Sequence, residues 1–262
     1  MLSVFMITYN NAPTIERALL SVSDLKDELV VVDSHSTDGT TEIVAKYADK
    51  LYHLDTDDLR KKYQFAQDQC SFEWVLFIDA DEWLTEELKQ EIRETLSRKD
   101  GGFDGYIIHR RNIYLGREIK HGGWYPDREI RLYKREKGRW EGGIHAKVVV
   151  DGKIGTLRHK YMHTPYSSTS HQIHTIIRYS EAYAWDLFNS NKKFSLLKMI
   201  GRPFFRFIRD YFLKMGFLDG IPGLIIAVST AYYVFMKQGK LWEIQNVLSQ
   251  SERANYGKIR GL

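Results

Sequence analysis

Two aspartates one residue apart follow an apolar segment in the first half of the chain. Residues 75–78 are valine, leucine, phenylalanine and isoleucine, and Asp79-Ala80-Asp81 comes next. Such a run predicts a strand buried on both faces, as in a parallel sheet. Open α/β sheets bind ligands outside the carboxyl ends of their strands, and carboxylate oxygens suit Mg²⁺ or Mn²⁺ that also grips a diphosphate. Asp79 and Asp81 are therefore candidate metal ligands. The alternative is that Asp79 caps a helix near Thr85 and Asp81 is merely solvated.

Strands and helices are predicted to alternate through the first hundred residues. Apolar strands are expected at 3–8, 29–32, 51–54 and 75–78, and helices at 13–22, 40–47, 59–69 and 85–97. This alternation predicts βαβ units, right-handed crossovers and an α/β fold with a mostly parallel sheet. A dinucleotide-binding domain would need a glycine-rich turn after the first strand. The turn here, Thr8 to Ala12, contains no glycine, which argues against that class.

Beyond residue 100 the pattern changes. Strand-like segments are expected at 103–109, 130–134 and 146–150, and Asp151-Gly152 predicts a hairpin turn into a strand at 153–157. Helices resume from residue 170. The hydrophobic content of 43% and charged content of 27% are those of a globular protein, and the single cysteine, Cys70, excludes an intramolecular disulfide and a cysteine-rich zinc site.

The charge is distributed unevenly along the chain. Residues 1–190 carry 26 Lys and Arg against 30 Asp and Glu, whereas residues 191–262 carry 12 against 4. A basic tail on an acidic body indicates an anionic partner for the tail. Nothing in the sequence resembles a nucleic-acid-binding module, so no nucleic acid partner is expected.

The tail combines basic and apolar residues in helical spacing. Arg202, Arg206 and Arg209 fall on one face of a helix expected at 202–213, with aromatic residues on the other side. This pattern is typical of a helix lying in an anionic membrane interface. The apolar run 221–236 is shorter than the ~20 residues that a bilayer span needs. It either inserts in the membrane or packs in the core.

Several of these segments together resemble family 2 glycosyltransferases of the GT-A fold. They are Thr8-Tyr9-Asn10, the 31–40 segment around Asp33, and the 77–82 segment around Asp79. Segments 124–127, 131–133, 143–145, 202–203, 216–220 and 231–235 further resemble the bacterial lipopolysaccharide-core β-1,4-glucosyltransferases. The resemblance implies a GT-A domain at 1–190, with a nucleotide-sugar half at 1–100 and an acceptor half at 101–190, followed by a basic, amphipathic, membrane-proximal helical tail at 191–262.

The resemblance also implies roles for individual residues. Asp79 and Asp81 would hold the metal, with His145 as a third ligand. Related enzymes often carry a glutamate after this histidine, where this chain has Ala146, so a structural role for His145 stays open. The residues implied for the nucleotide-sugar donor are Thr8, Tyr9, Asn10, Asp33, Lys62, Asp79 and Ala80. Lys62 is an alternative to Lys61, and a solvated lysine pair is the other interpretation.

The general base is expected beyond residue 100. Asp127 follows tryptophan, tyrosine and proline, an apolar surrounding that raises the pKa of a carboxyl group as a base requires. Glu141, beside Trp140, is the second candidate. An Asx turn after Pro126 is the structural alternative for Asp127.

Taken together, the residues and the resemblance predict an inverting glycosyltransferase that uses Mg²⁺ or Mn²⁺. It would move a hexose, glucose from UDP-glucose, to a lipid-linked glycan such as lipopolysaccharide core at the cytoplasmic face of a bacterial plasma membrane. Two alternatives remain. A sugar-phosphate nucleotidyltransferase would need a glycine-rich, basic loop after the first strand. A catalytically inactive membrane-binding module would show no metal-dependent affinity for UDP.

Overall fold

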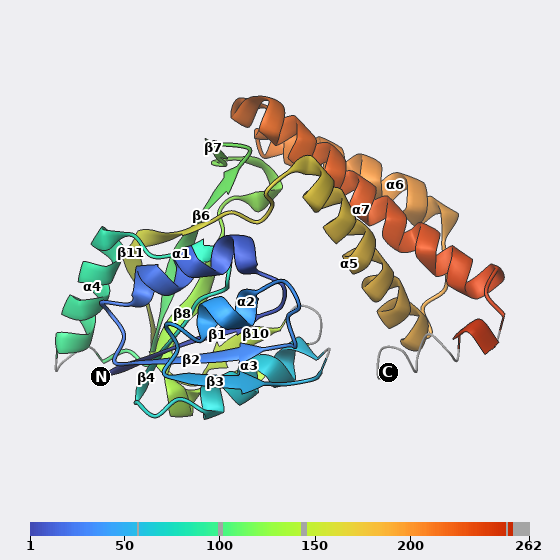
Figure 1. Cartoon of the computed structure of the whole chain (residues 1–262). Helices are drawn as coiled ribbons and strands as arrows, with labels where there is room; N and C mark the ends of the chain where they lie inside the picture. Colours follow the sequence, from blue (N-terminus) through green and yellow to red (C-terminus); the bar gives the residue numbers. More distant parts are fainter. Residues whose placement is uncertain (57, 99–101, 143–145, 250, 254–262) are drawn as a thin grey trace. The chain divides into compact units, whose positions relative to one another are not determined.

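The computed structural model describes residues 1–56, 58–98, 102–142, 146–249 and 251–253 (Figure 1). His145, the implied third metal ligand, lies outside these residues. The chain divides into two compact units. The first comprises residues 1–111 and 127–164, and the second comprises residues 112–126 and those from 165 onward.

The first unit is an α/β structure. Its elements are β1 (Leu2–Thr8), α1 (Ala12–Val22), β2 (Glu28–Asp33), α2 (Thr40–Val44), β3 (Lys50–His53), α3 (Leu59–Asp68), β4 (Trp74–Phe77), β5 (Glu82–Trp83), α4 (Glu86–Ser97), β6 (Gly105–Tyr114), β8 (Arg128–Lys134), β9 (Gly138–Glu141), β10 (Lys147–Val150) and β11 (Ile154–His163). The last residues of β6 belong to the second unit.

The central sheet has the strand order β3-β2-β1-β4-β8-β6-β11-β5. The first four strands are parallel, and β8 pairs antiparallel with both β4 and β6. This confirms the predicted α/β fold, in which the strands β1 to β4 form a parallel half of the sheet. The antiparallel half joins the parallel half through the β4–β8 pair.

Strand β1 is apolar along its length because it is buried on both faces. Its residues Val4 and Met6 belong to one core cluster, shared with α1 and α4. Phe5, between them, belongs to a second cluster that includes Ala66 of α3 and Trp140 of β9. Helices α1 and α3 therefore cover opposite faces of the sheet (Figure 1).

The hairpin predicted at Asp151-Gly152 is wrong. Strand β10, before this turn, pairs with β9 in a separate two-stranded sheet, and β11, after the turn, joins the central sheet beside β6. The turn therefore passes the chain from one sheet to the other. The Asp-Gly pair predicts a tight turn from local sequence, whereas strand pairing depends on residues far apart in the chain.

Glu28, at the start of β2, is a buried carboxylate held by several donors. It forms an ion pair with Lys50 at 2.7 Å, and it accepts hydrogen bonds from Ser3 Oγ at 2.6 Å and from the Ser71 backbone N–H at 2.8 Å. Burial raises the pKa of Glu28, but Lys50, Ser3 and Ser71 together outweigh burial and lower the pKa to about 2. The folded state therefore binds this proton more weakly than the unfolded chain does.

The ionised Glu28 should stabilise the fold at neutral pH. Since its folded pKa is depressed, the contribution is present above the ordinary pKa of 4.5 and is lost as the pH falls toward about 2. Glu28→Gln should lower the free energy of unfolding at pH 7 by about 2 kcal/mol. Denaturant titrations at several pH values should show the difference from wild type shrinking below pH 4.5. Glu136→Gln, at a side chain that is 87% exposed, should change little at any pH. An equal loss in both variants would contradict this assignment.

The second unit is mainly helical. It contains β7 (Arg117–Glu118), the 3-10 helix η1 (Gly122–Trp124), α5 (Thr169–Asn189), α6 (Leu196–Phe207), the π-helix η3 (Ile208–Leu213), the 3-10 helix η4 (Gly216–Asp219) and α7 (Gly220–Asn246). Helices α5, α6 and α7 lie side by side (Figure 1). The stretch Gly216–Asn246 is long and apolar enough to cross a membrane, by length and composition, and 28% of its most apolar window is buried. Core helices of soluble proteins meet the same criterion.

The three arginines of the predicted basic face of the tail have different partners in the structure. Arg206 and Arg209 both donate to Asp210, at 2.6 and 2.8 Å, and the Asp210 side chain is only 1% exposed. These two arginines therefore neutralise a buried carboxylate. Arg202 has no such partner among the residues that the structure describes, so the three arginines are not equivalent.

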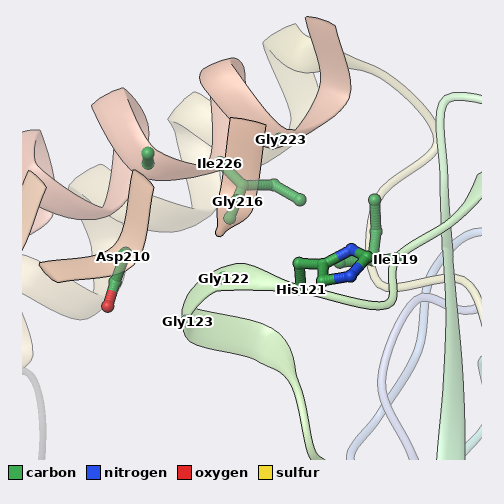
Figure 2. A pocket seen from close by; sticks show the side chains of 9 residues that line it. Ile119, His121, Gly122, Gly123, Asp210, Gly216, Gly223 and Ile226 are labelled. Carbon is green, nitrogen blue, oxygen red and sulfur yellow. The ribbon is translucent and has the colours of Figure 1, made fainter. Parts of the chain in front are cut away.

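The 121–123 segment packs against the helices of the second unit at a glycine-rich contact, which we call the glycine joint. Asp219 accepts hydrogen bonds from the backbone N–H groups of Lys120 and His121, at 3.1 and 2.8 Å. Figure 2 shows Gly122 and Gly123 facing the segments that carry Gly216 and Gly223. A side chain would not fit here, because a Cβ on Gly216 would lie 2.6 Å from the carbonyl oxygen of Asp210.

Gly223→Ala should destabilise this unit even though alanine favours helices. A Cβ at this position of α7 would meet the Gly216 carbonyl oxygen at 2.0 Å, so the helical segments would have to separate. We expect a loss of about 1–3 kcal/mol of unfolding free energy, measured by chemical denaturation. Gly201→Ala on α6 is the matched control, since nothing lies within 4 Å of its Cβ. That control should stabilise the protein by up to about 1 kcal/mol. If both variants changed the free energy of unfolding in the same direction, close packing at the glycine joint would be disproved.

Candidate active site

The carboxyl ends of β1, β2 and β4 lie at one edge of the sheet. Thr8, the last residue of β1, is in register with Asp33, the last residue of β2, and β4 runs parallel to β1 on its other side. Asp79 comes two residues after the end of β4. The structure thus brings the predicted residues Thr8, Asp33 and Asp79 to the same edge, as expected for a ligand site of an open α/β sheet.

Hydrogen bonds connect the turn after β1 to the turn after β2. The Asn10 N–H donates to Ser36 Oγ at 2.9 Å, and Asn10 Oδ1 accepts from the Thr37 N–H at 2.8 Å. Asp33 is fully buried, and its carboxylate accepts from the N–H and Oγ of Ser36. Tyr9 is 53% exposed. Asn10 and Asp33 therefore fix the conformation of the two turns at this edge of the sheet, whereas Tyr9 is exposed to solvent.

A pair of histidines beside Asp33 was missed by sequence reasoning. The rings of His35 and His53 stack with centroids 5.5 Å apart, and His53 Nδ1 lies 3.5 Å from Asp33 Oδ2. The two residues follow β2 and end β3, so the parallel pairing of these strands brings them together. A histidine just after the predicted strand-end aspartate was the available signal.

The Asp79–Glu82 segment is a closed turn. The Asp79 N–H donates to Glu82 Oε2 at 3.0 Å, and the Glu82 N–H donates to the Asp79 carbonyl oxygen at 3.1 Å. Helix α4 is capped by Thr85, whose Oγ1 accepts from the Leu88 N–H. The helix-capping alternative for Asp79 is therefore wrong.

Asp79 sits between a tyrosine and an arginine. Tyr63 of α3 donates its hydroxyl to Oδ1 at 3.1 Å, and Arg131 of β8 donates to Oδ2 at 3.3 Å. Burial raises the pKa of Asp79, the Glu82 carboxylate raises it further, and Arg131 opposes both, which leaves the pKa at about 7. A second positive charge nearby would favour the ionised form.

A buried charge network extends from this turn. Arg131 is 1% exposed and pairs with Glu82 at 2.9 Å and Glu129 at 2.8 Å. Arg110 of β6 pairs with Glu82 at 3.1 Å and with Asp127 at 2.7 Å. Buried ions are tolerated only when they are paired in this way. The network joins Asp127 to the Asp79–Glu82 turn through a single arginine.

Negative charge predominates in this region. Among the described residues, five carboxylates (Asp79, Asp81, Glu82, Asp127 and Glu129) belong to this region with two guanidinium groups, those of Arg110 and Arg131, and with His163 beside Asp81. When all five are ionised, the excess is three negative charges. Such a site is electrostatically suited to a divalent cation.

His163 approaches Asp81 from the last strand of the unit. The antiparallel pairing of β11 with β5 sets His163 opposite Glu82, and His163 Nε2 lies 3.4 Å from Asp81 Oδ2. Burial raises the pKa of Asp81, but His163 and Arg110 outweigh burial and lower it. Sequence reasoning missed His163, because 81 residues of intervening chain separate it from its partner.

The donor set fits a hard divalent ion in part. Asp79 and Asp81 are 28% and 31% exposed, so both carboxylates can reach a ligand. Among the residues that the structure describes, no three His, Cys, Asp or Glu side chains form a complete metal cluster. Mg²⁺ commonly binds through one or two carboxylates, with waters and substrate phosphates completing its shell. The residues present are compatible with that mode.

The surroundings of Asp127 differ from the apolar setting predicted for it. Its carboxylate is 22% exposed and paired with Arg110, so its immediate partner is a cation. Glu129, which sequence reasoning missed, belongs to the same network and is 35% exposed. Glu141 is 52% exposed and pairs with Arg139 on β9. Of the two base candidates named from the sequence, only Asp127 contacts the network among the described residues.

The remaining predicted residues are buried. Lys62 of α3 is 9% exposed, and Ala80 is 4% exposed. Their roles toward a nucleotide sugar remain predictions. Trp140 is 6% exposed and stacks on Tyr63 at 4.2 Å, so it is a core residue.

Comparison with known proteins places this site in context. Residues 3–158 match the model of the family described as "Glycosyl transferase family 2". The chain is 30% identical over 250 residues to the lipopolysaccharide core biosynthesis glycosyltransferase LpsC of Rhizobium meliloti, covering 92% of each chain. It is 29% identical over 270 residues to an uncharacterised glycosyltransferase of Rickettsia typhi, covering 97% of this chain and 92% of that protein.

Solved structures show a looser likeness. Staphylococcus aureus TarS 1–349 in complex with UDP-GlcNAc aligns with a TM-score of 0.49 at 16% identity, covering 95% of this chain and 93% of that chain. Glucosyl-3-phosphoglycerate synthase of Mycobacterium tuberculosis, in complex with Mn²⁺, UDP-glucose and glycerol 3-phosphate, aligns with a TM-score of 0.34 at 24% identity over 45% of each chain. Since the family model spans more than half of the chain and LpsC is matched over nearly its full length, this protein belongs to glycosyl transferase family 2.

Proposed function

We propose that this glycosyltransferase moves a hexose, glucose in the first instance, from a nucleotide-diphosphate sugar to a lipid-linked glycan, with inversion and with help from Mg²⁺ or Mn²⁺. The observation that carries the proposal is the Asp79–Asp81 turn. It lies at the ligand-binding edge of the parallel strands, with two partly exposed carboxylates and an excess of negative charge around them. The proposed nucleotide is UDP, as the sequence resemblance to the lipopolysaccharide-core glucosyltransferases implies.

The donor would lie along the edge formed by β1, β2 and β4. Tyr9 and the stacked His35–His53 pair offer flat rings for the nucleoside, and the buried Asp33 holds their turn in place. Asp79 and Asp81 would hold the cation, which when bound neutralises charge on the leaving diphosphate. His163 contacts Asp81 among the described residues, and His145, which lies outside them, stays the third ligand that the resemblance implies.

Asp127 is the proposed general base. Transfer with inversion needs a carboxylate that takes the proton from the acceptor hydroxyl. Arg110 holds the Asp127 carboxylate at 2.7 Å, and the 22% exposure leaves one side open to an acceptor. Arg110 also pairs with Glu82, so a single arginine positions both the proposed base and the Asp79–Glu82 turn.

A lipid-linked acceptor implies contact with a membrane. The segment 196–221 carries eleven large apolar side chains that are 46–84% exposed: Leu196, Leu197, Ile200, Phe204, Phe205, Phe212, Leu213, Met215, Phe217, Leu218 and Ile221. Exposed apolar area of this extent, on helices rich in lysine and arginine, is typical of a membrane-surface segment. The similarity to LpsC, a lipopolysaccharide core biosynthesis glycosyltransferase, supports a lipid-linked glycan as the acceptor. The proposed place of action is the cytoplasmic face of the plasma membrane.

Titration calorimetry with UDP-glucose, with and without Mn²⁺, tests the donor and the metal together. We expect binding that strengthens by at least about tenfold when Mn²⁺ is present, because the cation links the carboxylates to the diphosphate. GDP-mannose provides the comparison of nucleotides. Binding of UDP-glucose that does not change with Mn²⁺ would reject metal dependence. A preference for GDP-mannose would reject the UDP assignment.

A further inference from the structure

We propose that a groove between α6 and α7 is a binding site for the phosphate group of an anionic lipid. The groove has a volume of about 500 Å³. Its walls combine cations, Lys198, Arg202 and Arg206 of α6 with Lys237 of α7, and the apolar side chains Leu197 and Phe205. This site refines the membrane contact proposed above and rests on it.

The cations of the groove lack acidic partners on its walls. None of the residues lining it is a carboxylate. Arg206 is held by the buried Asp210, but within the described part of the chain no carboxylate lies within ion-pair distance of Lys198, Arg202 or Lys237. Like charges gathered in this way repel one another, so an anion bound among them would be stabilised by Lys198, Arg202 and Lys237.

Helical spacing explains why the charges converge. Lys198, Arg202 and Arg206 are four residues apart, so they lie along one face of α6. Lys237 comes from α7, which packs against α6. Two helices therefore supply charge from two directions, and the guanidinium of Arg202 can engage two phosphate oxygens at once.

Lys237 is anchored and partly buried. Its Nζ lies 4.0 Å from the ring centre of Tyr183 and 4.5 Å from that of Tyr233, in cation–π contact with both. Burial lowers the pKa of Lys237, and Arg206 and Arg202 lower it further. The ammonium group is thus fixed in position and lies in a positive potential that an anion would relieve.

The apolar part of the groove favours a lipid over free phosphate. Leu197 is 84% exposed and Phe205 is 61% exposed, and both line the groove together with the cations. Leu196, Ile200 and Phe204 continue the apolar surface along α6, at 61–70% exposure. A free phosphate would leave this surface in water, whereas a lipid covers it with its acyl chains.

A pair of double variants separates a defined site from general attraction. Arg202→Gln/Lys237→Gln removes two groove charges. Lys192→Gln/Lys193→Gln removes two exposed charges from the same unit outside the groove. General attraction to an anionic surface falls alike in both variants. In flotation with phosphatidylcholine vesicles containing phosphatidic acid, the groove variant should lose at least about tenfold more binding than the control. Equal losses of vesicle binding in the two double variants would contradict a phosphate-binding site in the groove.

A soluble ligand tests the groove apart from the membrane. Short-chain phosphatidic acid below its micellar concentration should bind the wild-type chain saturably in calorimetry and fail to bind the groove variant. Inorganic phosphate that binds as tightly as this lipid would overturn the lipid assignment. If wild type binds no vesicles but binds the soluble lipid, the membrane contact fails and the groove stands. Should the double variant lose its circular dichroism spectrum, Lys198→Gln, at an exposed position, takes its place in both measurements.

Discussion

Asp81→Asn should reduce sugar transfer by at least about a thousandfold, because the loss of a cation that neutralises the leaving diphosphate removes several kcal/mol of transition-state stabilisation. The substitution keeps the shape of the side chain and removes its charge. Asp81 is 31% exposed, and its partner His163 can still donate to the amide oxygen. The fold should therefore survive, and the loss should lie in the chemistry and in the metal.

Two measurements separate these effects. Calorimetry with UDP-glucose should show that the variant has lost the contribution of Mn²⁺, and circular dichroism should be unchanged. Asp151→Asn, at an exposed turn in the same unit, should retain the wild-type rate. A folded Asp81→Asn protein that keeps most of its activity would end the metal assignment.

Asp127→Asn should lower turnover by roughly two to four orders of magnitude, the usual range for a lost general base. Asparagine still offers an oxygen to Arg110, so the arginine should keep its place beside Glu82. Because Asp127 is separated from the Asp79–Glu82 turn by that arginine, affinity for UDP-glucose and Mn²⁺ should change little. Single-turnover rates at saturating donor measure the chemical step directly.

Glu129→Gln and Glu141→Gln are the comparison variants for the base. Glu129 shares the network and is 35% exposed, whereas Glu141 lies on β9 and pairs with Arg139. An active Asp127→Asn with an inactive Glu129→Gln or Glu141→Gln would transfer the role to that residue. If donor affinity falls in step with turnover in Asp127→Asn, the residue supports the donor site and is not the base.

The parallel half of the sheet was predictable because its signals are local. The apolar run before Asp79 predicted a strand at 75–78, and β4 is Trp74–Phe77. The helix expected at 59–69 is α3, Leu59–Asp68. Both depend on periodicity within a dozen residues, which a single sequence displays. The parallel pairing then follows from the βα alternation, and with it the shared edge of Thr8, Asp33 and Asp79.

The partners of the carboxylates were not predictable in this way. Arg131, Arg110 and His163 reach Asp79 and its neighbours from β8, β6 and β11, which join the sheet antiparallel and out of chain order. Periodicity carries no information on which distant strands become neighbours. One signal was present, since Arg131 interrupts the apolar strand segment Ile130–Tyr133. A charge in a buried strand needs a buried partner of opposite sign.

The tail was predicted as an amphipathic surface, but its arginines were treated alike. The helical period placed Arg202, Arg206 and Arg209 on one face, yet it could not show that Asp210 folds inward and binds two of them. The sequence places Asp210 directly after Arg209, so the pairing of these neighbours was visible in principle. The burial of Asp210 was not, since it depends on the packing of the glycine joint.

The contact between Trp140 and Tyr63 gives the protein an intrinsic optical probe. The indole stacks on the phenol at 4.2 Å, and the same phenol donates its hydroxyl to Asp79. A cation bound at Asp79 would withdraw charge from that carboxylate and alter its hydrogen bond with Tyr63. The polarity around the Trp140 indole would then change. Ligand titrations can therefore be followed by tryptophan fluorescence without an added label. Trp140→Phe should remove the Mn²⁺-dependent part of the signal and leave the emission of the other tryptophans.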